Sequence, residues 1–414
     1  MSKQTVLIIG SIWVEPNSSA AGSRMLQLIL RFLQQHWNVT FASAAVKGEK
    51  AMDLNSIGVE EVAIELNQST FDVFVKELDP TIVLFDRFMI EEQFGWRVAE
   101  KCPNALRILD TEDLHCLRKT RHKALKEKRV FSKNDLLKED ITKREIASIL
   151  RCDLSLMIST FEMDLLQNFF KIDKKLLHHL PFLLSQIDKT QVASWKNFDE
   201  RKHFTMIGNF LHAPNVDAVL LLKNTIWKQI RKQLPNAELH IYGAYPTQQI
   251  LELHHKKEGF LVKGYVPSPE IIVRNIKVVL APLRFGAGIK GKLTEAMVFG
   301  APSVTTSIGA EGMHGQFSWN GFVTDDFEDF AQKAVAIYTD EKLWVAAQQN
   351  GVAIINSHYD QEKNGSLLID KINEIQKNLT EHRVANFLGS MLQHQTLQST
   401  KYMSKWIEAK NKLQ

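Results

Sequence analysis

The chain has 414 residues, enough for two domains with full hydrophobic cores, and its 44% apolar and 24% charged residues are typical of a globular protein. The formal net charge of +4 is small for this length and does not indicate a nucleic-acid partner. Cys102, Cys116 and Cys152 show no metal-ligand spacing and leave an odd thiol, which favours a reduced, cytoplasmic protein. No apolar run approaches the length of a membrane span, so we expect membrane contact, at the inner face, to be peripheral.

The first half of the chain alternates short apolar runs with helix-like segments, which is the pattern of a parallel sheet covered by helices. The predicted strands are Val6–Gly10, Val39–Ala42, Ile82–Phe85, Leu106–Leu109 and Leu154–Ile158. After the first strand comes a long loop of small residues, 10–24, and then a predicted helix over Met25–Gln35. Because ligands of open parallel sheets bind beyond the carboxyl ends of the strands, this loop should line a cleft.

An acidic turn, Asp110–His115, follows the fourth predicted strand and contains Asp110, Glu112, Asp113 and His115. Three carboxylates in one turn repel one another unless solvent, a cation or a substrate shares the site. His115 could orient a substrate hydroxyl, and Glu112 or Asp113 could act as a base if its surroundings raised its pKa. The structural alternative is helix capping by Asp110 or Asp113, with exposed acids in the first turn.

A basic run, Arg118–Arg129, follows directly and holds seven Arg or Lys residues against one Glu. Such a run is most often the solvated face of a helix. The alternative is attraction to an anionic acceptor or to an anionic membrane surface, where each Lys or Arg contributes about 1 kcal/mol. Further along, Ser159–Glu162 is a helix start signal in which we expect Glu162 to be a capping acid of the first turn.

The alternation of strands and helices breaks over Leu183–Trp195 and resumes at His203. We therefore predict an N-terminal domain over 1–185 and a C-terminal domain over 200–380. The predicted strands of the second half are Phe204–Ile207, Glu238–Tyr242, Phe260–Val262, Val278–Ala281 and Ser303–Thr305. The apolar tail, about 385–414, is expected to form a helix that packs back on the N-terminal domain, and a partner-binding helix is the alternative.

The most informative stretch joins a strand, a glycine turn over Gly286–Lys292 and a helix that begins at Leu293 and is stopped by Gly300. Glycines let backbone N–H groups approach a ligand, Lys290 and Lys292 add positive charge, and the positive end of the helix faces the turn. This geometry suits a phosphate, and an ordinary solvated loop is the alternative. The turn has neither the Gly-x-Gly-x-x-Gly of a dinucleotide fold nor the Gly-Lys-Ser/Thr of a P-loop, which argues against a nicotinamide dehydrogenase.

The stretch Gly286–Val304, followed by Gly309–Gly312, resembles the donor-site signature of GT-B glycosyltransferases of the family 4 type. Met206–Asp217 resembles the opening of the second domain in the same family. The resemblance implies an α/β GT-B fold of two doubly wound, Rossmann-like domains with an interdomain cleft. It also implies a retaining hexosyltransferase that moves sugar from a nucleoside-diphosphate sugar to a glycan, lipid-linked or small-molecule acceptor. The sugar nucleotide is then a co-substrate, and neither a cofactor nor a metal ion is implied.

The resemblance also assigns roles to single residues. Glu295 matches the carboxylate that grips the ribose hydroxyls, and the lysines of the glycine turn match the positions that neutralise the leaving diphosphate. Ala287 departs from the pattern, because many members have a sugar-binding glutamate there, and Glu112 stands at the expected histidine. The predicted donor-binding residues are Gly208, Asn209, Tyr265, Val266, Gly286, Gly288, Lys290, Lys292, Glu295 and Glu311. The predicted catalytic residues are Glu112, Asp113 and His115, and the predicted acceptor-side residues are Gly22, Arg24 and Arg118.

Two other functions stay open on the sequence. Ala287 supports a non-catalytic module of the same architecture that binds a sugar nucleotide or a protein partner without turnover. The crowding of Glu112, Asp113 and His115 supports a nucleotide-sugar epimerase, which would need several acid and base groups in the cleft.

Overall fold

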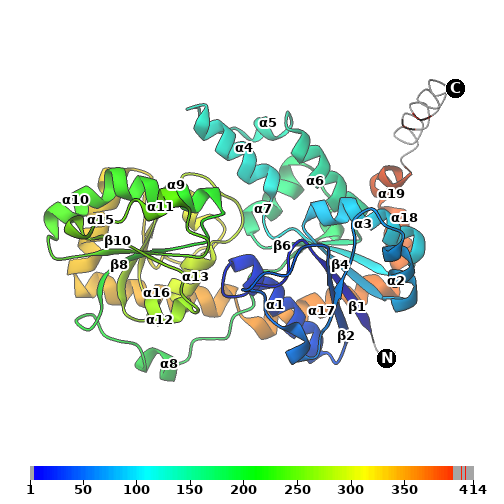
Figure 1. Ribbon diagram of the computed structural model, residues 1–414, viewed down its shortest axis with the longest axis horizontal. Helices are drawn as coiled ribbons and strands as arrows, with labels where there is room; N and C mark the ends of the chain where they lie inside the picture. The colour runs from blue at the N-terminus through cyan, green and yellow to red at the C-terminus, as the bar shows by residue number, and fades with distance from the viewer. Residues whose placement is uncertain (1–3, 395–401, 403–405, 407–414) are drawn as a thin grey trace.

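The computed structural model describes residues 4–394, 402 and 406, and it contains two parallel sheets, each flanked by helices (Figure 1). The first sheet has seven strands in the order β3-β2-β1-β4-β5-β6-β7, and the second has six in the order β10-β9-β8-β11-β12-β13. Neighbouring strands pair in parallel throughout both sheets. This is the pair of doubly wound, Rossmann-like units that the sequence predicts.

The strands of the first sheet are β1 Thr5–Gly10, β2 Asn38–Ser43, β3 Glu60–Ala63, β4 Ile82–Asp86, β5 Leu106–Asp110, β6 Leu154–Met157 and β7 Leu177–His179. The five strands predicted for this half are confirmed, and β3 and β7 were not predicted. Both lie at the edges of the sheet. An edge strand needs no continuous apolar run, and β3 reads Glu-Glu-Val-Ala, so its sequence carries little strand signal.

The helices of the first sheet's half are α1 Ala20–Gln34, α2 Thr70–Leu78, α3 Phe88–Lys101, α4 His115–Lys126, α5 Lys133–Leu136, α6 Asp140–Arg151 and α7 Thr160–Asp164. Short 3-10 helices are η1 Leu54–Ile57 and η3 Lys174–Leu176, and η2 Leu165–Phe169 is a π segment. Both faces of the sheet are buried, because Leu7 and Ile9 of β1 belong to one apolar core and Val6 and Ile8 to the other. A strand buried on both faces must be apolar at every position, which is why β1 was visible in the sequence.

The strands of the second sheet are β8 Lys202–Ile207, β9 Leu239–Tyr242, β10 Phe260–Gly264, β11 Ile276–Ala281, β12 Ser303–Thr305 and β13 Gly321–Val323. The five predicted strands are confirmed, and the unpredicted one, β13, is again at an edge. Its helices are α9 Ala213–Leu221, α10 Trp227–Gln233, α11 Gln248–Leu251, α12 Pro269–Val273, α13 Gly291–Val298, α14 Ser307–Ala310, α15 Phe327–Thr339 and α16 Glu341–His358. The remaining short segments are α8 Lys189–Ala193 in the linker, the π segment η4 Leu222–Ile226 and the 3-10 helix η5 Lys256–Glu258.

The chain returns to the first sheet after α16. Helix α17, Gln361–Lys377, places Leu368 and Ile372 in the same core as Val6 and Ile8. Helices α18, Leu379–Ala385, and α19, Phe387–Gln393, follow along the edge of that half (Figure 1). There Asn386 Nδ2 donates to Leu150 O at 2.7 Å. Most of the predicted tail helix beyond 394 lies outside the described residues.

No helix within the described part of the chain is both long enough and apolar enough to span a bilayer.

Candidate active site

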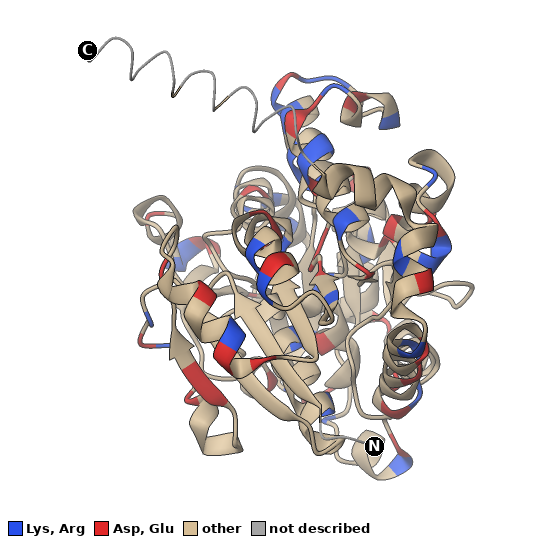
Figure 2. Cartoon of the chain, turned by 90° about the vertical axis from the view of Figure 1, so that its right-hand side faces the viewer, with Lys and Arg blue, Asp and Glu red and all other residues tan. Residues whose placement is uncertain are grey.

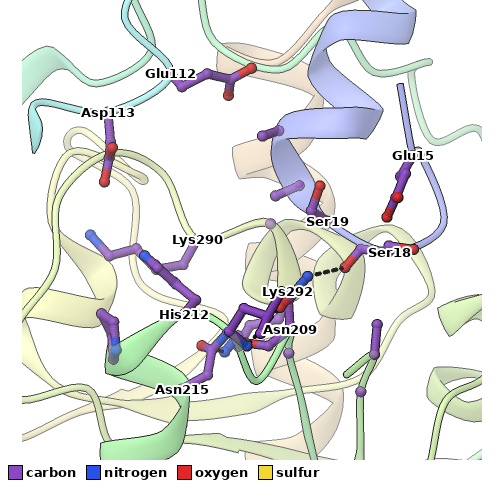
Figure 3. A pocket seen from close by; sticks show the side chains of 18 of the residues that line it. Glu15, Ser18, Ser19, Glu112, Asp113, Asn209, His212, Asn215, Lys290 and Lys292 are labelled. Atoms are coloured by element: carbon purple, nitrogen blue, oxygen red, sulfur yellow. Dashed lines mark hydrogen bonds between the residues drawn. The ribbon is translucent and has the colours of Figure 1, made fainter. Parts of the chain in front are cut away.

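A cavity of about 700 Å³ lies between the two sheets, at the carboxyl ends of the strands of both. The first half contributes residues that follow β1, β2, β4, β5, β6 and β7, and the second half contributes residues that follow β8, β9, β10 and β11. Figure 3 shows Glu112 and Asp113 across this cavity from Lys290, Lys292 and His212. The acidic turn of the first domain, with Arg87 and Arg118 beside it, and the lysines of the second domain thus lie on opposite sides of the cavity, and we call these sides the acidic wall and the basic wall.

The basic wall is the glycine turn together with the start of α13. Gly288 has a left-handed backbone with φ of 64°, and Lys290 is the residue before α13. The Lys290 Nζ donates to Gly288 O at 2.7 Å, and the Lys292 Nζ donates to Asn215 Oδ1 at 2.5 Å. Both ammonium groups thus sit at the N-terminal end of the helix, where its dipole also favours an anion.

Burial shifts the pKa values of this wall toward the neutral forms. It lowers the pKa of Lys290 to about 8 and that of Lys292 to about 7, although Glu311 and Glu295 respectively act in the opposite direction. Burial also raises the pKa of Glu295 to about 7. The positive charges of the two lysines are therefore not fully compensated by nearby carboxylates, and a bound anion would stabilise their protonated forms.

The acidic wall is the turn Asp110–His115. Asp113 accepts from Arg118 Nε at 2.6 Å and from Arg118 Nη2 at 3.1 Å, and its other near neighbour is His115 Nε2 at 3.4 Å. Burial opposes ionisation of Asp113, but Arg118 and His115 together hold its pKa below the usual range. Burial lowers the pKa of His115 to about 4, so at neutral pH the imidazole is uncharged beside an ionised carboxylate.

Glu112 is the acid of this turn with the opposite behaviour. Burial, with Asp110 adding to it, raises the pKa of Glu112 well above its usual range. Its Oε1 has no hydrogen-bond partner among the described residues, and its backbone is left-handed with φ of 61°, which is strained for a residue with a side chain. The turn thus offers one carboxyl group whose pKa is raised and one, Asp113, whose pKa is lowered, a division that suits acid and base roles.

Three predicted site residues lie elsewhere than expected. Arg24 is 1% exposed and its guanidinium binds Asp110 and Leu180 O, at 3.0 Å and 2.7 Å, so it does not face the cavity as an acceptor-side residue or solvent as a helix-start arginine. Gly22 serves packing, because a Cβ there would lie 2.2 Å from Glu15 O. Glu311 is outside the cavity lining and pairs with Arg121.

The other predicted residues, with the exception of Gly288, line the cavity: Gly208, Asn209, Tyr265, Val266, Gly286, Lys290, Lys292, Glu295, Glu112, Asp113, His115 and Arg118. Gly288 lies behind them, where a Cβ would come within 2.8 Å of Asp113 Cβ. Sequence reasoning missed Arg87, which also lines the cavity, and it assigned no role to two further lining residues, His212 of the Met206–Asp217 stretch and Tyr245 of the turn after β9. Arg87 is a single residue directly after β4 with no motif around it, so only the fold brings it to the site.

The basic run is occupied by contacts within the protein. Arg121 of α4 donates to Gly286 O at 2.9 Å and pairs with Glu311 at 2.7 Å, and the His122 ring stacks on Phe285 with centroids 4.2 Å apart. On the outer side, Lys123 pairs with Glu139 and Arg129 with Glu127 and Asp135. Positive and negative residues are accordingly mixed over this protruding part in Figure 2. The interpretation of the whole run as a solvated face is wrong, because its inner side joins the two domains.

One group within the described residues has the geometry of a metal site: His203, Glu238 and His240. It lies at the beginnings of β8 and β9, whereas the cavity lies at the other ends of these strands. The His203 Nδ1 accepts from the Glu238 backbone N–H at 3.1 Å, and the His240 Nε2 lies 2.8 Å from Glu238 Oε2. The group is thus separate from the candidate active site.

Comparisons with known proteins agree with this geometry. Residues 201–340 match the family model described as glycosyl transferases group 1. No curated protein sequence matches the chain. Among solved structures, HepE of Anabaena in complex with UDP and glucose has a TM-score of 0.64 at 11% identity, covering 89% of this chain and 99% of that one. Sucrose-phosphate synthase of Thermosynechococcus elongatus has a TM-score of 0.65 at 12% identity, covering 90% and 99%.

A third similar structure is TarM of S. aureus in complex with fondaparinux, α-GlcNAc-glycerol and UDP, with a TM-score of 0.55 at 16% identity. The match covers 74% of this chain but only 58% of that TarM chain. At these identities the structural likeness shows the fold, which is GT-B. The match to the group 1 glycosyltransferase model is confined to residues 201–340, from β8 to α15, and it shows a group 1 glycosyltransferase domain in the second half of the chain.

Proposed function

We propose that the protein transfers a hexosyl unit from a nucleoside-diphosphate sugar to a glycan, lipid-linked or small-molecule acceptor, with retention of configuration. The observation that carries this proposal is a pair of lysines at the start of α13, the buried Lys290 and the half-buried Lys292, facing the acidic turn across the cavity. A leaving diphosphate needs positive charge in a site shielded from water, and these lysines supply it without requiring a metal ion. HepE and TarM both bind UDP in the structures above, which supports a nucleoside diphosphate as the ligand.

The donor would lie along the second domain. Glu295, one helical turn beyond the lysines, is placed to accept hydrogen bonds from the ribose hydroxyls, and Tyr265 and Val266 line the part of the cavity left for the base. The Tyr245 hydroxyl donates to Glu15 Oε2 at 2.9 Å, so this end of the cavity is closed by both domains. The base would therefore be enclosed when the domains are together.

The sugar would lie against the acidic wall. Ala287 supplies no carboxylate to it, but Asp113 approaches the same turn, since a Cβ on the neighbouring Gly288 would be 2.8 Å from Asp113 Cβ. We infer that Asp113 of the first domain takes the sugar-holding role for which Ala287 is unsuited. Glu112, whose pKa is raised by burial, and uncharged His115 are then available to exchange hydrogen bonds with the sugar and the acceptor.

An apolar acceptor portion is supported by the cavity mouth, where Ile12, Val46 and Leu211 are exposed although they line the cavity. Peripheral contact with the inner face of a membrane through 118–129 is supported by exposed lysines at 119, 126 and 128 and by Val130, which is 91% exposed just beyond them. A cytoplasmic location is supported by three cysteines that are free and buried.

The test is a calorimetric and thermal-shift panel of UDP, GDP, ADP and their sugars in the presence of a chelator, because a ligand that binds the native state raises its stability. We expect one nucleoside diphosphate to bind without metal, and Glu295→Ala to weaken that binding without lowering the melting temperature of the free protein. Failure of all of them to bind would overturn the proposal. Binding of a sugar nucleotide with no transfer to any acceptor would favour the non-catalytic module, for which Ala287 is the supporting observation.

A further inference from the structure

Glu162, which the sequence predicts as a capping acid of α7, lies instead between the two domains. Its side chain is completely buried. The Oε1 atom accepts from the backbone N–H of Leu114 and from that of Gly288, both at 2.9 Å. The Oε2 atom has no hydrogen-bond partner among the described residues. A buried carboxyl group with one unsatisfied oxygen is costly, so its retention calls for a role beyond starting a short helix.

The two N–H groups that meet at Glu162 belong to the two walls of the cavity. Leu114 is the last residue of the acidic turn before α4, and Gly288 is the centre of the glycine turn. One oxygen atom thus joins a backbone N–H of the first domain to one of the second. The walls are in contact at this point, because a Cβ on Gly288 would lie 2.8 Å from Asp113 Cβ and 3.3 Å from Ile158 Cγ2.

Glu162 can accept the two backbone hydrogen bonds whether its carboxyl group is protonated or ionised. Burial, to which Asp113 adds, raises the pKa of Glu162 to about 8, while Lys290 and the two N–H groups act to lower it. A protonated carboxyl group still has a carbonyl oxygen that accepts two hydrogen bonds. The connection between the walls therefore depends on an acceptor at this position and does not require a negative charge.

We propose that Glu162 is a positioning residue of the glycosyl-transfer site, whose side chain sets the distance between the acidic turn and the glycine turn. This inference rests on the proposed function. Lys290, Lys292 and Glu295 are all on the second domain and would still bind the donor without Glu162. The acidic turn, however, would no longer be held against the sugar. Loss of Glu162 should therefore reduce transfer and leave donor binding in place.

The first experiment compares Glu162→Leu with Glu162→Gln. Leucine has a similar size but accepts no hydrogen bond, whereas glutamine keeps an oxygen that can accept from both N–H groups. We expect kcat to fall about 100-fold in Glu162→Leu, as for other ångström-scale misplacements of catalytic groups, with the Kd for UDP unchanged. Glu162→Gln should restore most of kcat. Equal kcat in all three proteins, or an equal loss in both variants, would overturn the proposal.

Glu145 provides a matched control. It is another fully buried carboxylate at the same end of α4, and it accepts from His115 N at 3.0 Å and Cys116 N at 2.7 Å. Both of these partners belong to the first domain, as Glu145 itself does. Glu145→Leu should therefore destabilise the fold about as much as Glu162→Leu. Only Glu162→Leu should change how the domains sit relative to each other.

This difference can be measured without any substrate, as the distance between spin labels at Lys138→Cys and Lys228→Cys. Both positions are exposed and on different domains, and the three native cysteines are buried. We expect a broader and longer distance distribution in Glu162→Leu and an unchanged one in Glu145→Leu. If Glu162→Leu does not fold, Glu162→Asp, one methylene shorter, takes its place with the same expectation. An unchanged distribution would overturn the positioning role, whereas absent UDP binding in the unmodified protein would overturn the proposed function instead.

Discussion

The glycine turn and the acidic turn are the two halves of one site, yet the chain builds them in different ways. The glycine turn lies within one continuous stretch, and its two lysines come from positions 290 and 292. The acidic turn is also short, but its geometry depends on distant groups: Arg24 fixes Asp110, and Glu145 and Glu162 hold the N-terminal end of α4. The cations of the diphosphate site therefore come from a local motif, whereas placing the acid and base groups requires the whole first domain.

The two walls also differ in electrostatics. Burial lowers the pKa of the lysines of the basic wall and raises the pKa of Glu112 in the acidic wall. Burial thus disfavours the charged forms of these groups in both walls until a charged ligand lies between them. A sugar nucleotide, with an anionic diphosphate and a neutral sugar, matches that division.

The largest effect is expected on stability, from breaking the ion pair between Arg24 and Asp110 that holds the acidic turn. Arg24→Leu leaves Asp110, which is completely buried, without its cation, and breaking a buried pair in this way costs about 3–5 kcal/mol. Denaturant unfolding should show this loss. Arg144→Leu is the control, because its partner Glu92 is in the same domain but its own side chain is 54% exposed, and exposed pairs contribute less than about 1 kcal/mol. Equal losses of unfolding free energy in the two variants would mean that the buried Arg24–Asp110 pair contributes no more stability than an exposed pair.

The next effect concerns the basic wall. Replacing Lys290 and Lys292 together by alanine should lower the rate of transfer by about 10²- to 10³-fold, because the leaving diphosphate loses its two cations. Steady-state kinetics checks this. Lys277→Ala is the control, since Lys277 is a largely buried lysine of the same domain that lies 3.3 Å from the Phe198 ring centroid, outside the cavity lining. A similar loss of rate in the control would point to general disruption of the domain.

A third prediction tests the contact between the walls. Gly288→Ala places a methyl group against Asp113 and should separate the turns, with a loss in kcat of about 100-fold. Gly58→Ala imposes comparable backbone strain, since Gly58 has φ of 85°, but nothing lies within 4 Å of the added Cβ. It should cost about 1–2 kcal/mol of stability and leave kcat unchanged. A full rate in Gly288→Ala would show that the contact is dispensable.

The smallest effect is a dependence of donor binding on pH. The pKa values of Lys290 and Lys292, about 8 and about 7 in the free site, should rise when a diphosphate binds. The affinity for the diphosphate is therefore highest at pH values below the pKa values of the free site. It falls as pH rises through the pKa values of the bound site, by up to about tenfold per pH unit for each proton taken up on binding. Calorimetry of UDP binding at pH 8 in buffers of different ionisation enthalpy should show proton uptake. Glu295, with a pKa of about 7, ionises in the same pH range and could also take up the proton. Proton uptake that persists in Glu295→Gln but decreases in Lys292→Met would assign the proton to Lys292.

The sequence by itself determined the interior strands of both sheets and the donor half of the site. Strands buried on both faces must be apolar along their length, and a turn that binds phosphate places its glycines and lysines within a few residues, so both leave a local pattern. The edge strands β3, β7 and β13 left no such pattern because they are mostly half-buried or exposed, whereas the fourth edge strand, β10, begins with two buried apolar residues and was predicted.

The tertiary structure decided the rest of the site. It buried Arg24 against Asp110, turned the inner side of the basic run toward the glycine turn, and placed Glu162 between the domains. The reason is topological: parallel strands end at one edge of each sheet, and the two edges face each other, so residues 86 to 165 positions apart become neighbours. Contacts between residues so far apart leave no local pattern in the sequence.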